Sequence, residues 1–167
     1  MKIVVLADSH DHLENLKKVL AAVKDTDEML HCGDIIAPFS VKAIGEQYSK
    51  RTHIVWGNND GDRKHCEERA KPFSQITIHG DDAFLVIGGK KIAMNHYPDK
   101  AEDFAKSGKY DLVCYGHTHR VDLREAGKTI ILNPGEVMGM YDSKAHYALY
   151  DTETNKVELK SVDANPA

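Results

Sequence analysis

The chain has 167 residues, of which 41% are hydrophobic, and this allows one compact domain with a sizeable core. Its formal net charge of -4 argues against a broadly basic surface that tracks phosphate backbones, so we expect no stable nucleic-acid complex. No apolar run approaches the roughly 20 residues of a membrane helix, and the first run is too short for a signal-peptide core. We therefore expect a cytoplasmic protein without membrane contact.

The first third of the chain alternates apolar runs with amphipathic segments. An Asp11-x-x-Glu14 capping box is expected to open the first helix, and Pro38 the second. This order predicts parallel strands joined by right-handed crossovers. The expected elements are strands at 2–7, 28–32 and 52–56, with helices from the capping box to about 23 and from 38 to about 48.

The rest of the chain is richer in short strands. Gly and Asp turns separate several of them closely, which predicts antiparallel hairpins. We expect a helix at 98–107 and strands at 75–79, 83–88, 91–95, 111–115, 121–125, 129–132, 147–150 and 157–162. The mixture predicts an α/β (α+β) fold, a four-layer αββα sandwich of two mixed β-sheets flanked by helices. Residues 1–167 form one domain in this prediction, with a polar tail at 163–167 that frays.

Cysteine and histidine carry different information. Cys32, Cys66 and Cys114 are odd in number and irregular in spacing, so we expect buried, reduced thiols rather than a disulfide framework. The 10 histidines matter more, because imidazole is a common metal ligand.

Five of the expected strands end directly in Asp, Asn or His. Ligands of open α/β sheets bind beyond the carboxyl ends of parallel strands, where loops converge. These side chains offer oxygen and nitrogen donors without thiolate, which suits Mn, Ni, Fe, Zn or Co better than Ca. The candidate metal ligands are Asp8, His10, Asp34, Asn58, His96, His117 and His119.

Seven side chains are too many for one open catalytic metal, but they suit two ions if one carboxylate bridges them. Asp34 is the natural bridge. At an extended strand end, His117 and His119 would point the same way, so that each could reach one of two adjacent ions. Gly33, Gly57 and Gly116 would let the backbone turn sharply and approach the ions closely.

These residues together resemble the calcineurin-like metallophosphoesterase superfamily, whose pattern runs Asp-x-His, Gly-Asp, Gly-Asn-His-Asp, a lone His and Gly-His-x-His. The match spans Asp8 to His119 in order, and the turn at 133–135, Asn-Pro-Gly, is similar to a loop of its small single-domain phosphodiesterases. The resemblance implies two divalent ions, with manganese as the first candidate, and attack on phosphorus by a metal-bound hydroxide. By this resemblance one ion is held by Asp8, His10, Asp34 and His119, and the other by Asp34, Asn58, His96 and His117.

One position departs from the family pattern. Asn59 stands where the superfamily usually has the His that steadies the transition state and protonates the leaving oxygen. We treat Asn59 as the candidate catalytic residue, because its amide can donate a hydrogen bond to a phosphoryl oxygen. An amide cannot act as a general acid near neutral pH. Turnover is therefore expected to favour esters with good leaving groups.

Each candidate ligand taken alone has a structural explanation. Asp8 could cap a helix, Asp34 and Asn58 could be ordinary turn residues, and His96 could be a packed imidazole. All these explanations would have to hold together at five strand ends, so the metal hypothesis is favoured. His12 is expected to be a solvated residue of the first helical turn. The other histidines outside the candidate set are expected to be surface or packing residues, namely His31, His53, His65, His79 and His146.

The favoured function is a metal-dependent phosphodiesterase that acts on a small phosphodiester. A phosphomonoesterase is the nearest alternative, although no obvious Arg or His cluster supports the extra charge of a monoester. A non-catalytic interaction scaffold, resembling the retromer subunit of this fold, is the alternative from another class. All seven ligand positions keep competent side chains, which favours the enzyme. A homodimer is plausible because of exposed strand and loop apolar residues.

Overall fold

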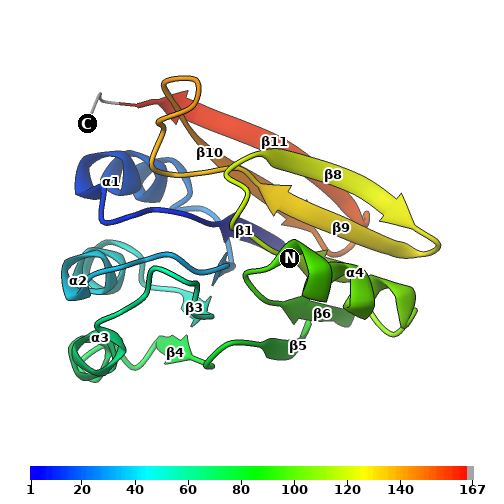
Figure 1. The fold of residues 1–167 in the computed structure, drawn as a ribbon, viewed down its shortest axis with the longest axis horizontal. Coiled ribbons are helices and arrows are strands. Elements are labelled where there is room, and N and C mark those ends of the chain that lie inside the picture. The colour runs from blue at the N-terminus through cyan, green and yellow to red at the C-terminus, as the bar shows by residue number, and fades with distance from the viewer. Residues whose placement is uncertain (165–167) are drawn as a thin grey trace.

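The computed structural model describes residues 1–164 and contains two mixed β-sheets (Figure 1). In the first sheet β1 to β4 run parallel, β10 pairs antiparallel with β1, and β11 pairs antiparallel with β10 at the edge. Its strands are, in spatial order, β11 (Lys156–Asp163), β10 (Lys144–Asp151), β1 (Lys2–Leu6), β2 (Glu28–His31), β3 (Arg51–Ile54) and β4 (Ile76–Ile78).

The second sheet has parallel strands at its centre and antiparallel strands at both edges. β6, β7 and β9 run parallel, whereas β5 and β8 pair antiparallel with β6 and β9. Its strands are, in spatial order, β5 (Ala83–Ile87), β6 (Lys90–Met94), β7 (Leu112–Cys114), β9 (Thr129–Pro134) and β8 (Val121–Ala126).

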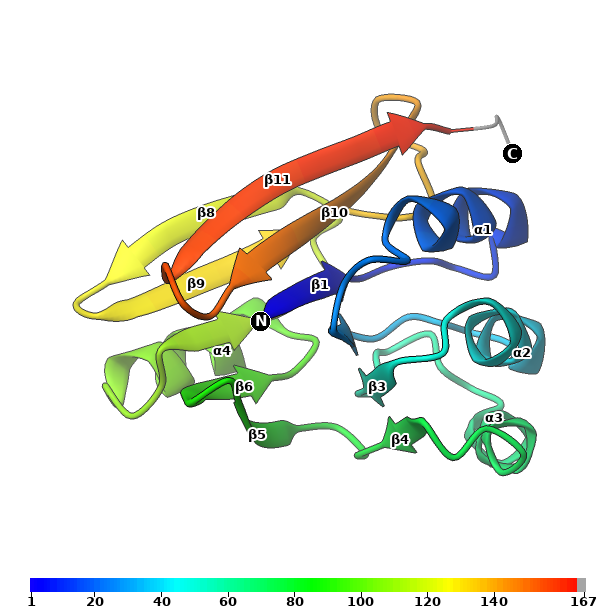
Figure 2. The same ribbon diagram turned by 180° about the vertical axis from the view of Figure 1, so that it is seen from behind.

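Four helices flank the two sheets. Figures 1 and 2 show α1, α2 and α3 side by side along one flank and α4 beside β6, away from them. The helices are α1 (Leu13–Ala22), α2 (Pro38–Gln47), α3 (Arg63–Ala70) and α4 (Pro98–Lys106).

Three apolar clusters separate the four layers. The first packs α1, α2 and α3 on one face of the first sheet, with Leu16 and Ile44 completely buried. The second fills the space between the sheets and includes Val5 and Ile92. The third packs α4 on the outer face of the second sheet through Ala101. The four-layer αββα prediction is therefore confirmed, and burial of these side chains supplies the main stabilising free energy.

The sequence prediction was wrong in local details. Helix α3 was not predicted. The close spacing of β4 and β5 does not make a hairpin, because β4 pairs with β3 and β5 belongs to the other sheet. Asp11 does not cap α1; the N-cap is His12, whose Nδ1 accepts from the backbone N–H of Asn15 at 3.3 Å. Asp11 instead accepts a hydrogen bond from Ser40 Oγ at 2.9 Å.

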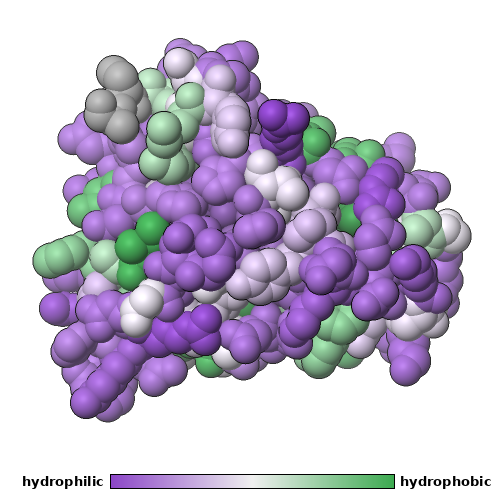
Figure 3. Space-filling view, viewed as in Figure 1, coloured by the Kyte–Doolittle hydropathy of each residue, from purple (hydrophilic) through white to green (hydrophobic). Residues whose placement is uncertain are grey.

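The end of the chain and the surface complete the description. β11 continues to Asp163, into the tail that was expected to fray, and 165–167 lie outside the described residues. The three cysteines are free and buried, as predicted. No helix in the described part of the chain is long and apolar enough to cross a membrane. The face in Figure 3 is mainly hydrophilic, with small separate apolar patches, so polar clusters are the natural candidates for a functional site.

Candidate metal centre

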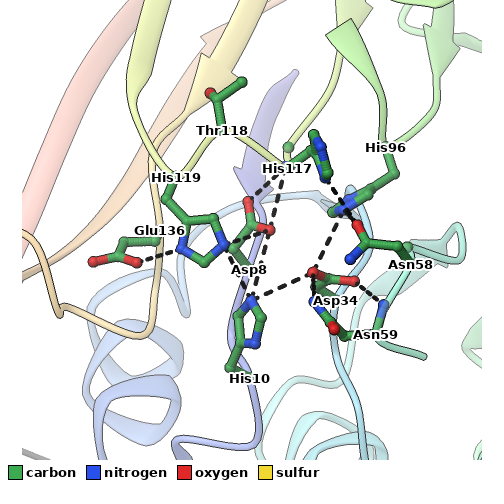
Figure 4. A network of polar contacts seen from close by, with 12 residues as sticks. Asp8, His10, Asp34, Asn58, Asn59, His96, His117, Thr118, His119 and Glu136 are labelled. Carbon is green, nitrogen blue, oxygen red and sulfur yellow. Dashed lines mark hydrogen bonds and ion pairs between the residues drawn. The ribbon is translucent and has the colours of Figure 1, made fainter. Parts of the chain in front are cut away.

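The loops after β1, β2, β3, β6 and β7 bring all seven predicted ligand side chains into one polar network (Figure 4). The network lies at the carboxyl ends of these parallel strands, where side chains from distant parts of the chain converge. The predicted gathering of the seven residues is therefore observed.

The first group of donor atoms belongs to Asp8, His10, Asp34 and His119, and these atoms all lie within 4.8 Å of one another. The His10 and His119 Nε2 atoms are 3.2 Å apart. His10 Nε2 also lies 3.4 Å from Asp34 Oδ2, and His119 Nε2 lies 3.6 Å from Asp8 Oδ1. Two carboxylates and two imidazoles pointing at one another form a donor set that suits a divalent cation.

The second group surrounds Asn58 Oδ1. That oxygen is 3.0 Å from His96 Nε2 and 2.8 Å from His117 Nδ1. His96 Nε2 also lies 3.5 Å from Asp34 Oδ2. The same Asp34 oxygen therefore borders both groups, as a bridging ligand would require.

The backbone of the site is unusual at five of the seven residues. Asp8, His10, Asp34, His117 and His119 have left-handed φ angles of 52°, 46°, 55°, 69° and 59°. This conformation costs a non-glycine residue about 1–2 kcal/mol, and such residues persist where the surrounding structure holds them. The extended strand end predicted for His117 and His119 is thus wrong, because β7 ends at Cys114. From a turn, the two imidazoles still reach different groups.

The glycines of the site act in two ways. Gly33 has a φ of 94°, which glycine adopts without steric cost. Gly57 and Gly116 instead allow close approach: a Cβ at Gly57 would collide with the Asp34 carboxylate, and one at Gly116 would lie 2.8 Å from Asp8 Oδ2. The predicted close approach is thus found at Gly57 and Gly116, which leave room for the carboxylates, and the left-handed backbone is found at Gly33.

Two buried carboxylates outside the predicted set hold the site in place. Asp60 accepts backbone N–H bonds from Asp34 at 2.9 Å, Ile36 at 2.6 Å and Gly57 at 2.6 Å, which ties two ligand loops together. Glu136 accepts from His119 Nδ1 at 2.6 Å, and this contact orients the ring so that Nε2 faces the other donors.

Sequence reasoning overlooked both carboxylates. The sequence does point to Asp60, because Asp60 is the last residue of the Gly57-Asn58-Asn59-Asp60 run that matches the Gly-Asn-His-Asp pattern. Glu136 follows the Asn-Pro-Gly turn, and no local pattern connects it with His119.

The pKa values of several acidic and imidazole groups of the site are shifted from their usual values. Burial raises the pKa of the Asp8 carboxyl to about 7, although His96 and His119 oppose this shift. Burial acts the same way on Asp34, but contacts from His96 and Asn59 outweigh it and hold the pKa of Asp34 below its usual range. The hydrogen bond to Glu136 raises the pKa of His119. A cation among these groups would stabilise both carboxylates in their charged form, so the donor set fits divalent metal.

The candidate catalytic residue, Asn59, contacts the shared carboxylate. Its backbone N–H donates to Asp34 Oδ1 and its Nδ2 to Asp34 Oδ2, both at 2.8 Å. The side chain is exposed and comes from the loop after β3. Asn59 is therefore placed at the site and helps to hold Asp34.

Most of the other histidines have structural partners. His31 is buried and bonds to Ser9 Oγ at 3.1 Å, while His53 bridges Glu28 at 3.2 Å and His79 at 2.9 Å. His12 caps α1. They belong to the packing and capping of the domain rather than to the seven candidate ligands.

Comparison with known proteins identifies the family. The family model described as the calcineurin-like phosphoesterase superfamily domain matches residues 1–155. The phosphodiesterase MJ0936 of Methanocaldococcus jannaschii is 34% identical over 157 residues, covering 92% of this chain and 94% of the relative. A probable metallophosphoesterase of Bacillus subtilis, YsnB, is 24% identical over 179 residues, covering 98% of this chain and 91% of the relative. The chain belongs to the calcineurin-like phosphoesterase superfamily.

Solved structures agree with this placement. The structure of an archaeal phosphodiesterase has a TM-score of 0.90 and 30% identity, covering 97% of this chain and 100% of that chain. The vacuolar protein sorting 29 protein of Cryptosporidium parvum, at a TM-score of 0.66 and 18% identity over 99% and 98% of the chains, shares the fold. Family membership confirms the prediction of a metallophosphoesterase.

Proposed function

We propose that this protein is a phosphodiesterase that hydrolyses a small phosphodiester with two divalent metal ions. The observation that carries the proposal is the position of Asp34 Oδ2, 3.4 Å from His10 Nε2 and 3.5 Å from His96 Nε2. One ion would be held by Asp8, His10, Asp34 and His119, and the other by Asp34, Asn58, His96 and His117. Bound there, the ions would supply Lewis-acid activation of water and of phosphoryl oxygens.

The chain's own residues would position the reactants. His119 is fixed by Glu136, and Asp34 is fixed by Asp60 and Asn59, so the donors keep their arrangement while substrate binds. The exposed amide of Asn59 would donate a hydrogen bond to a phosphoryl oxygen but cannot protonate a leaving group. The site therefore favours esters whose alcohol leaves without acid catalysis.

The diester is preferred over the monoester for two reasons. A relative of 34% identity is named a phosphodiesterase. A monoester carries more negative charge than a diester and would need an additional cation at the site. Arg63, which follows the loop after β3, is already engaged. It bonds to the carbonyl oxygens of Asp60 at 3.0 Å and Gly57 at 3.3 Å and to the carboxylate of Asp81. These bonds tie Arg63 to the loop after β3 and leave it engaged in holding that loop.

The non-catalytic scaffold is the weaker alternative. The vacuolar protein sorting 29 structures are 18–19% identical to this chain, which extends only to the fold. Here every one of the seven ligand positions keeps a competent donor inside one connected network. Manganese as the preferred ion, a cytoplasmic location, a homodimer and the lack of a stable nucleic-acid complex all stay predictions.

The experiment compares hydrolysis of bis(p-nitrophenyl) phosphate with that of p-nitrophenyl phosphate in the presence of Mn, Ni, Mg or Zn. Wild type should hydrolyse the diester faster, and Asp34→Asn and His117→Ala should each lose about a hundredfold or more. His65→Ala is the matched control, because His65 is exposed and pairs with Asp62 at 2.6 Å. The proposal would be contradicted if none of the four metals supported hydrolysis of the diester, or if both site variants kept the wild-type rate.

The leaving-group expectation needs a separate comparison. Ethyl p-nitrophenyl phosphate and diethyl phosphate differ in the acidity of the alcohol that departs. Wild type should strongly prefer the aryl ester, and Asn59→His should narrow the gap by supplying an acid. If Asn59→His leaves the aryl-to-alkyl ratio of rates unchanged, the missing general acid is not what limits the reaction.

A further inference from the structure

A pocket of about 250 Å³ adjoins the candidate metal centre on the side of His119. His119 and Glu136 form the wall that the pocket shares with the metal centre, and Val121 of β8 adds an apolar surface. A ligand with its phosphate at the metal centre could therefore extend directly into this pocket. None of the seven candidate ligands other than His119 lines it.

The pocket presents an exposed aromatic ring. Tyr141 is 65% exposed, and its ring centroid lies 5.9 Å from that of His119. The backbone N–H of Tyr141 donates to Glu136 Oε1 at 2.8 Å, so the carboxylate that orients His119 also anchors the tyrosine. Arg120 Cζ lies 5.8 Å from the centre of the Tyr141 ring. A ring held in place with most of its surface in water offers a stacking surface for a planar ligand.

Polar groups surround that ring. Asp142 lies beside Tyr141, and its carboxylate contacts His146 Nε2 at 2.9 Å and 3.1 Å. Within the described residues 1–164 Arg120 pairs with no carboxylate, and its guanidinium lies over the Tyr141 ring, so a ligand bound beside that ring would meet its positive charge. The pocket thus combines a stacking surface with hydrogen-bond acceptors and a cation.

We propose that this pocket, the Tyr141 subsite, binds the nucleobase of a nucleotidyl ester whose phosphate lies at the metal centre. The inference rests on the proposed phosphodiesterase function and assigns a substrate class to it. A base is flat and carries donors and acceptors at its edge, which matches Tyr141, Asp142 and Arg120. An alkyl chain would leave these polar groups unused, and a free anion would not use the ring.

The test is calorimetric binding to manganese-loaded protein, without turnover. Adenosine 5′-monophosphate and uridine 5′-monophosphate are compared with ribose 5-phosphate, which has the same phosphate but no base. Stacking of a base on an aromatic side chain is expected to increase affinity about five- to a hundredfold. Tyr141→Ala should remove this preference, whereas Tyr141→Phe should keep it. Phe39→Ala is the matched control, because Phe39 is 61% exposed and lines a different pocket.

The outcomes separate the two proposals. Equal affinity for nucleotides and ribose 5-phosphate, or a preference that survives in Tyr141→Ala, would overturn the subsite. Diester hydrolysis without a nucleotide preference would overturn the subsite and leave the phosphodiesterase intact. A nucleotide preference that depends on Tyr141, in a protein that hydrolyses no diester, would support the subsite and refute the catalytic proposal.

Discussion

Replacing Gly57 by alanine should disrupt the shared carboxylate with little change elsewhere. An added Cβ would meet the Asp34 carboxylate and would lie 2.6 Å from the Asp34 backbone nitrogen. Ordinary van der Waals contact begins near 3.4 Å, so Asp34 must move by about 1 Å. A displacement of that size at a reacting centre costs about a hundredfold in rate.

The folding cost of Gly57→Ala should be smaller than its functional cost. Overpacking a tight site costs about 1–3 kcal/mol in the free energy of unfolding. Asp60 ties Gly57 to Asp34 through two backbone N–H bonds, so the loop cannot simply swing away. We expect the fold to survive and the affinity for the second ion to fall with the first, because both would share Asp34.

Three measurements on Gly57→Ala check this reasoning: urea denaturation, calorimetric metal titration and diester hydrolysis. Gly61→Ala is the control, because Gly61 lies four residues away and a Cβ there would meet no heavy atom within 4 Å. If Gly57→Ala binds two ions with wild-type affinity, Asp34 is not held against the Gly57 backbone in the way the structure indicates, and the argument for a bridging carboxylate fails.

Three further substitutions test the support of the site. Glu136→Gln should weaken metal binding about tenfold by calorimetry, because it removes the charge that orients His119, whereas the exposed Glu158→Gln should not. Asp60→Asn should lower the free energy of unfolding by about 2–3 kcal/mol in urea, because an amide offers one oxygen to three N–H donors; a loss below 0.5 kcal/mol would count against that role. Asp8→Asn should stabilise the metal-free protein. The pKa of Asp8 is raised from 3.8 to about 7 in the folded state, so its contribution is favourable below pH 3.8 and is lost as the pH rises through 7, by up to about 4 kcal/mol. Thermal unfolding with chelator at pH 5 and pH 8 should show the larger gain at pH 8, and equal gains would contradict the assignment to Asp8.

The parallel strands and their polar ends were predictable because both signals are local. Each run of apolar residues is followed within two residues by Asp, Asn or His, as in the run at 2–7 with Asp8 and the run at 28–32 with Asp34. The order of strands and helices then places these ends at one edge of a sheet. The gathering of the seven side chains follows from that topology, whereas their division into two groups of donors was implied by the family resemblance.

The missed features depend on contacts between distant parts of the chain. α3 has the sequence Arg-Lys-His-Cys-Glu-Glu-Arg-Ala and buries only Cys66 and Ala70, so it has no apolar periodicity to detect. The role of Glu136 depends on His119, which is 17 residues away. β4 looked like half of a hairpin because its spacing to β5 is short, but pairing with β3 gives it a place in the parallel sheet instead.

The site lowers the free energy of unfolding in two ways, through its backbone and through its charges, and a bound metal ion would affect these two contributions differently. Five left-handed residues cost about 1–2 kcal/mol each, and together they match a large share of the roughly 5–15 kcal/mol that stabilises a typical domain. The second part is electrostatic, since Asp8 is fully buried beside Asp34. A bound cation would offset the electrostatic part and leave the backbone part in place. Stability should therefore rise with metal concentration. Asp8→Asn should abolish part of that rise and leave the left-handed backbone of the other four residues unchanged.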